Sequence, residues 1–105
     1  MSFESTTVIV TGAAQGIGQA VAKSYAEKGA RVVLADTQEP EGAAAAAEIR
    51  NSGGEAIFVP CDVSSESDIT HLMRETIEAF GQIDILINNA GFGIWKSPYE
   101  LRVKE

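Results

Sequence analysis

The sequence is poor in cysteine, proline and aromatic residues, and it contains no long apolar run. Of its 105 residues, one is cysteine, three are proline and 7% are aromatic. The lone Cys61 cannot form an internal disulfide, which agrees with a reducing compartment. No run approaches the roughly 20 apolar residues that a membrane span needs, and the first residues have neither a basic segment nor an apolar signal core. We therefore expect a cytoplasmic protein with no membrane partner.

Positive charge is also scarce. Eight Lys and Arg residues face 15 Asp and Glu residues, which gives a formal net charge of −7. Nucleic acids and anionic membranes both reward basic patches, so this balance argues against either as a partner. A chain of this length forms one domain at most, and a hydrophobic fraction of 45% is that of an ordinary globular protein. We therefore treat residues 1–105 as one domain.

Short runs rich in Val and Ile alternate with longer segments of helical periodicity. Strands are predicted over 6–11, 31–35, 55–60 and 83–88, and helices over 16–28, 39–51 and 65–80. This alternation is typical of a parallel α/β sheet. Ser65 and Gly81 are suited to cap the third helix, and Gly29 to end the first. The apolar face of the first helix, which should cover the sheet, is predicted to hold Ile17, Ala20, Val21, Ser24 and Tyr25.

A glycine-rich segment, Thr11 to Gly18, joins the first predicted strand to the first predicted helix. Gly12 would permit a tight exit from the strand, and Gly16 would let backbone N–H groups approach a pyrophosphate. Gly18 would let the helix pack close to the sheet. No Lys-Ser or Lys-Thr follows, which excludes a phosphate loop of the NTPase type. The segment therefore predicts a dinucleotide site.

An acidic residue, Asp36, ends the next apolar run about twenty residues further on, where dinucleotide folds place the carboxylate that binds the adenosine ribose. A carboxylate there accepts hydrogen bonds from the ribose hydroxyls and repels a 2′-phosphate. The predicted cofactor is therefore NAD. Arg31 lies at the wrong end of its strand to compensate. The alternative is that Asp36 only caps the following helix.

With these features, together with Asp62-Val63 and Asn88-Asn89-Ala90-Gly91, the sequence resembles the short-chain dehydrogenase/reductase family over nearly its whole length. The resemblance implies a Rossmann-like parallel sheet of strand order 3-2-1-4, with ligands bound in the crevice between strands 1 and 4. Here that sheet would be truncated after the fourth strand, so the domain is incomplete relative to the family. In the family, a basic residue at Gln15 or Thr37 would favour NADP, and neither position is basic.

The resemblance also implies individual roles. Asp62 would meet the adenine amino group and the Val63 backbone the ring edge, although Asp62 could instead cap a helix. Asn88 would tie neighbouring strands together. The backbone after it would line the cofactor ribose. The predicted cofactor-binding residues are Gly12, Gln15, Gly16, Ile17, Gly18, Asp36, Asp62, Val63, Asn89, Ala90 and Gly91. No metal site is expected, and His71 is taken as a solvated surface residue.

The family's catalytic residues, a Ser and a Tyr-x-x-x-Lys motif, normally lie well beyond the Asn-Asn-Ala-Gly element. Ser97, Tyr99 and Lys104 do not replace them, because Lys104 follows Tyr99 by five residues and would be rotated by about 100° on a helix. We predict no catalytic residue. An intact member would transfer a hydride between NAD(H) and an alcohol or ketone, and this chain alone should be inactive.

Two alternatives to an enzyme portion remain open. One is a stand-alone nucleotide-binding or scaffolding module. The other is a nucleotide-sugar or methyl-donor fold, which shares the glycine turn but does not explain Asn88 to Gly91.

The fourth predicted strand, 83–88, is apolar on both faces and would have one unpaired edge. Pairing with a second copy would satisfy its N–H and C=O groups. We therefore expect a homo-oligomer formed through this edge.

Overall fold

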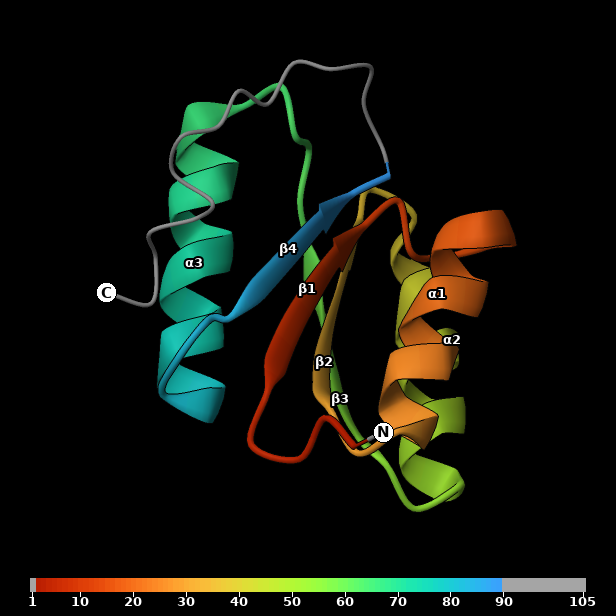
Figure 1. Ribbon diagram of the computed structural model, residues 1–105. Coiled ribbons are helices and arrows are strands. Elements are labelled where there is room, and N and C mark those ends of the chain that lie inside the picture. Colours follow the sequence, from red (N-terminus) through yellow and green to blue (C-terminus); the bar gives the residue numbers. More distant parts are fainter. Residues whose placement is uncertain (1, 90–105) are drawn as a thin grey trace.

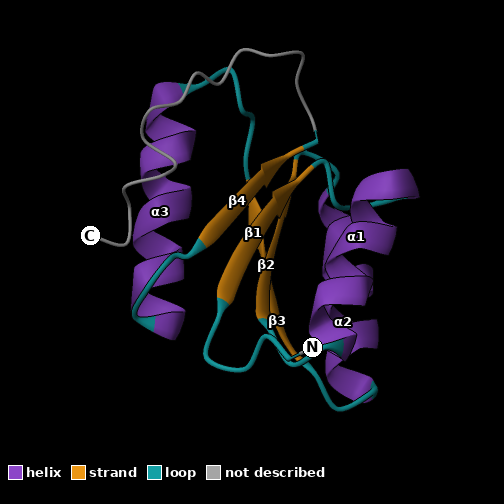
Figure 2. Ribbon diagram, in the orientation of Figure 1, coloured by secondary structure: helices purple, strands orange, loops and turns teal. Residues whose placement is uncertain are grey.

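Four parallel strands form one sheet that carries helices on both faces in the computed structural model, which describes residues 2–89. The elements are β1 (Thr7–Thr11), α1 (Gly16–Glu27), β2 (Arg31–Asp36), α2 (Glu39–Asn51), β3 (Glu55–Pro60), α3 (Glu66–Phe80) and β4 (Ile85–Asn88). The strand order is β3-β2-β1-β4, as predicted. Helices α1 and α2 cover one face and α3 covers the other (Figures 1 and 2).

The two faces of the central strands bury different apolar sets. Val8 and Val10 of β1 pack with residues of α1 and α2, whereas Ile9, between them, packs in a second cluster with Leu72 of α3. Alternate residues of a strand point to opposite faces, so a strand buried on both faces must be apolar throughout. That requirement explains the continuous Val and Ile runs.

The predicted inward face of α1 is wrong in part. Ile17 is 75% exposed, and Ala20 and Ser24 are also exposed. The buried residues of α1 are Gly18 and Ala22. The positions of α1 that are fully buried thus hold small residues, and the periodic apolar pattern did not reveal this.

The predicted ends of α3 are confirmed. The Ser65 side chain caps its start by accepting a hydrogen bond from the Asp68 N–H at 3.2 Å. Gly81 ends the helix in the left-handed conformation, at φ 81°, and its N–H donates to Ile77 O. The Asp68 carboxylate accepts from the Asp62 N–H at 2.9 Å, so the cap is tied to the end of β3.

Strand β4 is shorter than predicted. Asp84, just before it, links the start of this strand to β1: its N–H donates to Thr7 O, and its carboxylate accepts from the Thr7 N–H at 2.8 Å. Within residues 2–89, β4 pairs with β1 alone, and its four residues are only half buried. No helix in this described part is both long and apolar enough to span a membrane.

Candidate functional site

The glycine loop between β1 and α1 lies at the carboxyl ends of the strands. Gly12 and Gly16 both have φ of 65°, a left-handed conformation that favours glycine. The N-cap of α1 is Gln15, and the first intrahelical bond runs from the Gln19 N–H to Gln15 O. The N–H groups of residues 16–18 precede that bond, so they have no intrahelical acceptor. This is the usual arrangement for binding an anion at a helix N-terminus.

Gly18 is required by a close backbone contact. A Cβ atom at this position would lie 2.1 Å from Gly12 O and 2.7 Å from Asn89 Nδ2. Neither distance is compatible with a side chain unless the loop moves. Close packing was predicted against the sheet, whereas the atoms nearest to Gly18 belong to the glycine loop and to Asn89.

Asp36, at the end of β2, bonds to two loops. One carboxylate oxygen accepts from the Ala14 N–H and the other from the Gln38 N–H, each at 3.0 Å. The N-cap of α2 is Gln38, so the alternative that Asp36 only caps this helix is wrong. A carboxylate has about four lone-pair sites, which leaves capacity for ribose hydroxyls. Gln15 donates to the Gln38 side chain at 3.2 Å beside it.

The end of β4 is tied to the same loop. The Thr11 hydroxyl donates to Asn88 Oδ1 and accepts from the Asn89 N–H, both at 2.9 Å. Asn89 Nδ2 donates to Gly12 O at 3.3 Å. Asn88 thus ties β4 to β1, as the resemblance implied, while Asn89 fixes the exit of the glycine loop. Ala90 and Gly91 lie outside the described residues.

Asp62 and Val63 follow β3 and lie further along the strand ends. Asp62 accepts from both the N–H and the hydroxyl of Ser64, at 2.9 and 2.7 Å, and the hydroxyl bond first, then the N–H bond, lowers the pKa of this exposed carboxyl. Because Ser65 is the N-cap of α3, Asp62 does not cap that helix. Val63 is half buried against the α3-side core. The structure thus joins the ends of β1, β2 and β4 by hydrogen bonds, and Asp62 bonds instead to the start of α3.

Comparison with known proteins places this arrangement in a family. Residues 6–105 match the family model described as short chain dehydrogenase. The chain is a short-chain dehydrogenase family member. It is 41% identical over 91 residues to an uncharacterized oxidoreductase of Thermotoga maritima, an alignment that covers 87% of this chain and 36% of the relative. It is 40% identical over 89 residues to an L-fucose dehydrogenase of Oryctolagus cuniculus, covering 85% of this chain and 30% of the relative.

Solved structures of short-chain dehydrogenases share the fold. A hydroxysteroid dehydrogenase from Escherichia coli superposes with a TM-score of 0.83 at 35% identity, covering 95% of this chain and 42% of that one. A short chain dehydrogenase/reductase from Burkholderia phymatum in complex with NAD gives a TM-score of 0.83 at 35% identity, covering 95% of this chain and 37% of that one. The chain thus spans less than half the length of these relatives.

Several residues of this short-chain dehydrogenase site were not predicted. Thr11 joins β1 to the end of β4, Gln38 holds Asp36, and Gln19 donates to Ala14 O at 2.8 Å. Thr11 ends an apolar run, and Gln19 follows Gln15 by one helical turn. A polar residue at each of these positions was the only sequence feature that could have indicated a role in the site.

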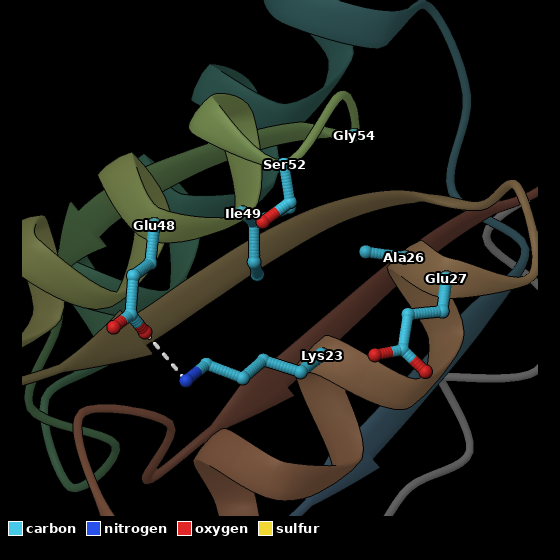
Figure 3. A pocket seen from close by; sticks show the side chains of 7 residues that line it. All are labelled: Lys23, Ala26, Glu27, Glu48, Ile49, Ser52 and Gly54. Carbon is cyan, nitrogen blue, oxygen red and sulfur yellow. Dashed lines mark ion pairs between the residues drawn. The ribbon is translucent and has the colours of Figure 1, made fainter.

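A separate hollow of about 350 Å³ lies between α1 and α2 (Figure 3). It is lined by Lys23, Ala26, Glu27, Glu48, Ile49, Ser52 and Gly54. An ion pair between Lys23 and Glu48 bridges the two helices. The lining residues come from the second half of α1, the end of α2 and the turn that follows α2, away from the glycine loop. This hollow is therefore distinct from the predicted cofactor crevice.

Cys61, beside Asp62, is buried in the folded chain. Burial, followed by the Asp68 and Asp62 carboxylates, raises the pKa of its thiol from 9.0 to about 11. Because the thiolate is the reactive form, we expect the folded chain to react slowly with a thiol reagent until the pH approaches 11, whereas the chain unfolded in urea should react from about pH 9. The stability that this proton contributes should be complete below pH 9 and lost as the pH rises through 11. Equal labelling profiles for the folded and unfolded chains would contradict the raised pKa.

Proposed function

We propose that the chain is the NAD-binding portion of an oxidoreductase that transfers a hydride between NAD(H) and an alcohol or ketone. The observation that carries the proposal is the position of Asp36, whose carboxylate is bonded to the glycine loop next to the free N–H groups at the start of α1. An anion and a ribose hydroxyl group can thus be held side by side. The relative from Burkholderia phymatum, in complex with NAD, supports this choice of cofactor.

Different residues are proposed to bind different parts of the dinucleotide. The N–H groups of residues 16–18 bind the pyrophosphate, Asp36 the adenosine ribose, and Asp62 with Val63 the adenine. Gln15 and the exposed Ile17 side chain flank the pyrophosphate. The family resemblance assigns the second ribose to Asn89, Ala90 and Gly91. Bound NAD supplies the hydride acceptor, and NADH the donor.

None of the chain's residues is proposed to be catalytic. Ser97, Tyr99 and Lys104 lie outside the described residues, and the spacing of the last two still argues against a catalytic pair. In this proposal, substrate binding and general-acid catalysis are functions of an intact enzyme and not of these residues. We therefore expect the 105-residue chain to bind cofactor and to show only background dehydrogenase turnover in an NADH absorbance assay.

Substitution of Gly16 tests where the cofactor lies. Replacing Gly16 by Val should weaken NADH binding at least about tenfold, because a side chain would occupy the space in which the pyrophosphate meets the N–H groups. A Cβ atom there meets no protein atom within 4 Å, so the cost to the fold is the left-handed backbone alone. Calorimetric titration and circular dichroism on one sample measure the two effects.

Gly81→Val is the matched control for Gly16→Val. Gly81 also has a positive φ and an open Cβ position, but it lies at the end of α3. The Gly81→Val chain should lose about as much stability as the Gly16→Val chain and keep the NADH affinity of the parent. A folded Gly16→Val chain that binds NADH like the parent would mean that the cofactor is held elsewhere.

Self-association through β4 is the proposed quaternary arrangement. The half-buried residues of β4 and its single described partner, β1, leave an edge that a second copy could pair with. Two-fold symmetry is the commonest closed solution. Light scattering at micromolar concentration should give at least twice the chain mass of 11.1 kDa. Replacing Leu86 by Lys should shift the mass toward that of the monomer, and a parent chain that is already a stable monomer would refute this arrangement.

A further inference from the structure

Gln19 contacts the glycine loop through both its backbone and its side chain. Its N–H donates to Gln15 O at 3.4 Å, and its Nε2 donates to Ala14 O at 2.8 Å. One residue on the first turns of α1 therefore holds two consecutive carbonyl groups of the loop. We propose that Gln19 is a positioning residue that keeps this loop in the form that binds the pyrophosphate, an inference that rests on the proposed NAD site.

Ala14 is held from its other side as well. Its N–H donates to Asp36 Oδ2 at 3.0 Å, and the neighbouring Ala13 N–H donates to Ala35 O at 3.2 Å. Ala14 itself is 1% exposed. The amino side of this residue is thus fixed to β2, and its carbonyl oxygen is bonded to α1 by the Gln19 side chain.

The bond from Gln19 Nε2 to Ala14 O fixes the orientation of the peptide group between Ala14 and Gln15. The C=O and N–H of one trans peptide point in opposite directions, so anchoring Ala14 O also sets the direction of the Gln15 N–H. Gly12 and Gly16, both with φ of 65°, flank the segment and give it unusual freedom to rotate. A turned Ala14–Gln15 peptide would displace the residues that follow it, whose N–H groups are proposed to bind the pyrophosphate. Gln19 opposes that rotation.

The test is Gln19→Met, which keeps the length of the side chain and removes the donor. Ala20→Met is the matched control, because Ala20 is an exposed neighbour on α1. A net hydrogen bond of about 0.5–1.5 kcal/mol corresponds to roughly two- to twelvefold in an equilibrium constant. We expect Gln19→Met to lower the affinity for NADH and for inorganic pyrophosphate by about three- to tenfold. Adenosine, which has no phosphate, should bind with the affinity of the parent chain. Ala20→Met should change none of the three.

A second measurement needs no ligand. Amide hydrogen exchange at Ala14 and Gln15 should accelerate about three- to tenfold in Gln19→Met, while exchange in β1 stays unchanged. Parent-like pyrophosphate affinity with parent-like exchange would overturn the proposal, and so would a parallel loss of adenosine binding, which indicates general damage. If the parent chain binds no NADH, the proposed function fails, whereas the exchange rates still decide whether Gln19 orders the loop.

Discussion

Replacing Gly18 by Ala is expected to lower the free energy of unfolding by about 3 kcal/mol, the upper part of the range for overpacking. Helix propensity alone predicts the opposite sign, since Ala in a helix is favoured over Gly by about 1 kcal/mol. The Cβ atom would lie 2.1 Å from Gly12 O, a backbone atom that cannot rotate away like a side chain. The contact should therefore outweigh propensity, and α1 must move outward or the loop must deform.

Urea unfolding followed by circular dichroism measures the Gly18→Ala effect. Ser24→Ala, at an exposed position of the same helix, provides the control and should change stability by less than about 0.5 kcal/mol. NADH affinity should fall together with stability in the Gly18 variant, because Gly12 O and Asn89 Nδ2 meet at the same point. A Gly18→Ala chain as stable as the parent would show that the loop yields at little cost.

NADH should bind at least about thirtyfold more tightly than NADPH, equivalent to about 2 kcal/mol. The 2′-phosphate of NADPH would be placed against the Asp36 carboxylate, and like charges brought together across an interface cost several kcal/mol. Arg31, on the same strand, lies at its opposite end with its guanidinium 5.7 Å from the centre of the Phe80 ring, so it does not compensate. Calorimetric titration of one preparation with both cofactors gives the ratio.

Asp36→Asn should reduce that ratio to a few-fold, because the amide keeps an oxygen acceptor and removes the charge. Glu39→Gln removes the same charge three residues later, in the first turn of α2, and should leave most of the preference intact. Raising the salt concentration should narrow the preference of the parent for NADH only modestly, since Asp36 is half buried and partly buried charges are screened less than exposed ones. Equal or tighter binding of NADPH by the parent would reject the assignment of Asp36.

The element order could be predicted because it depends on coarse features of the chain, whereas the strand order was implied by the family resemblance. Runs such as Thr7 to Val10 can be buried only as strands within a sheet that is covered on both faces, and glycines mark the ends of α1 and α3. The inward face of α1 could not be predicted in the same way. Its orientation depends on the fit of Gly18 to Gly12 O, a contact between backbone atoms that no hydrophobic pattern records.

The sequence indicated the loop and the acidic residue of the candidate site but not the hydrogen bonds that join them. Glycine spacing and the place of Asp36 identified the loop and the acid. The bonds from Asp36 to Ala14, and from Gln19 to the same residue, depend on where the loop folds back in space. A Gln inside a helix has many possible partners, so sequence alone gave no reason to select Gln19.

The hydrogen bonds between the glycine loop and the end of β4 also affect the rate of folding. Asn89 reaches Gly12 O across 77 positions of the chain, and its N–H reaches the Thr11 hydroxyl across 78. Closing so long a segment is entropically costly, and non-local pairings of this kind slow folding. The nucleotide loop, although made near the start of the polypeptide, is completed only when the last described strand docks. During synthesis the loop would therefore become able to bind the cofactor only after β4 has docked. The binding energy of the cofactor would then stabilise the complete sheet relative to partly folded forms.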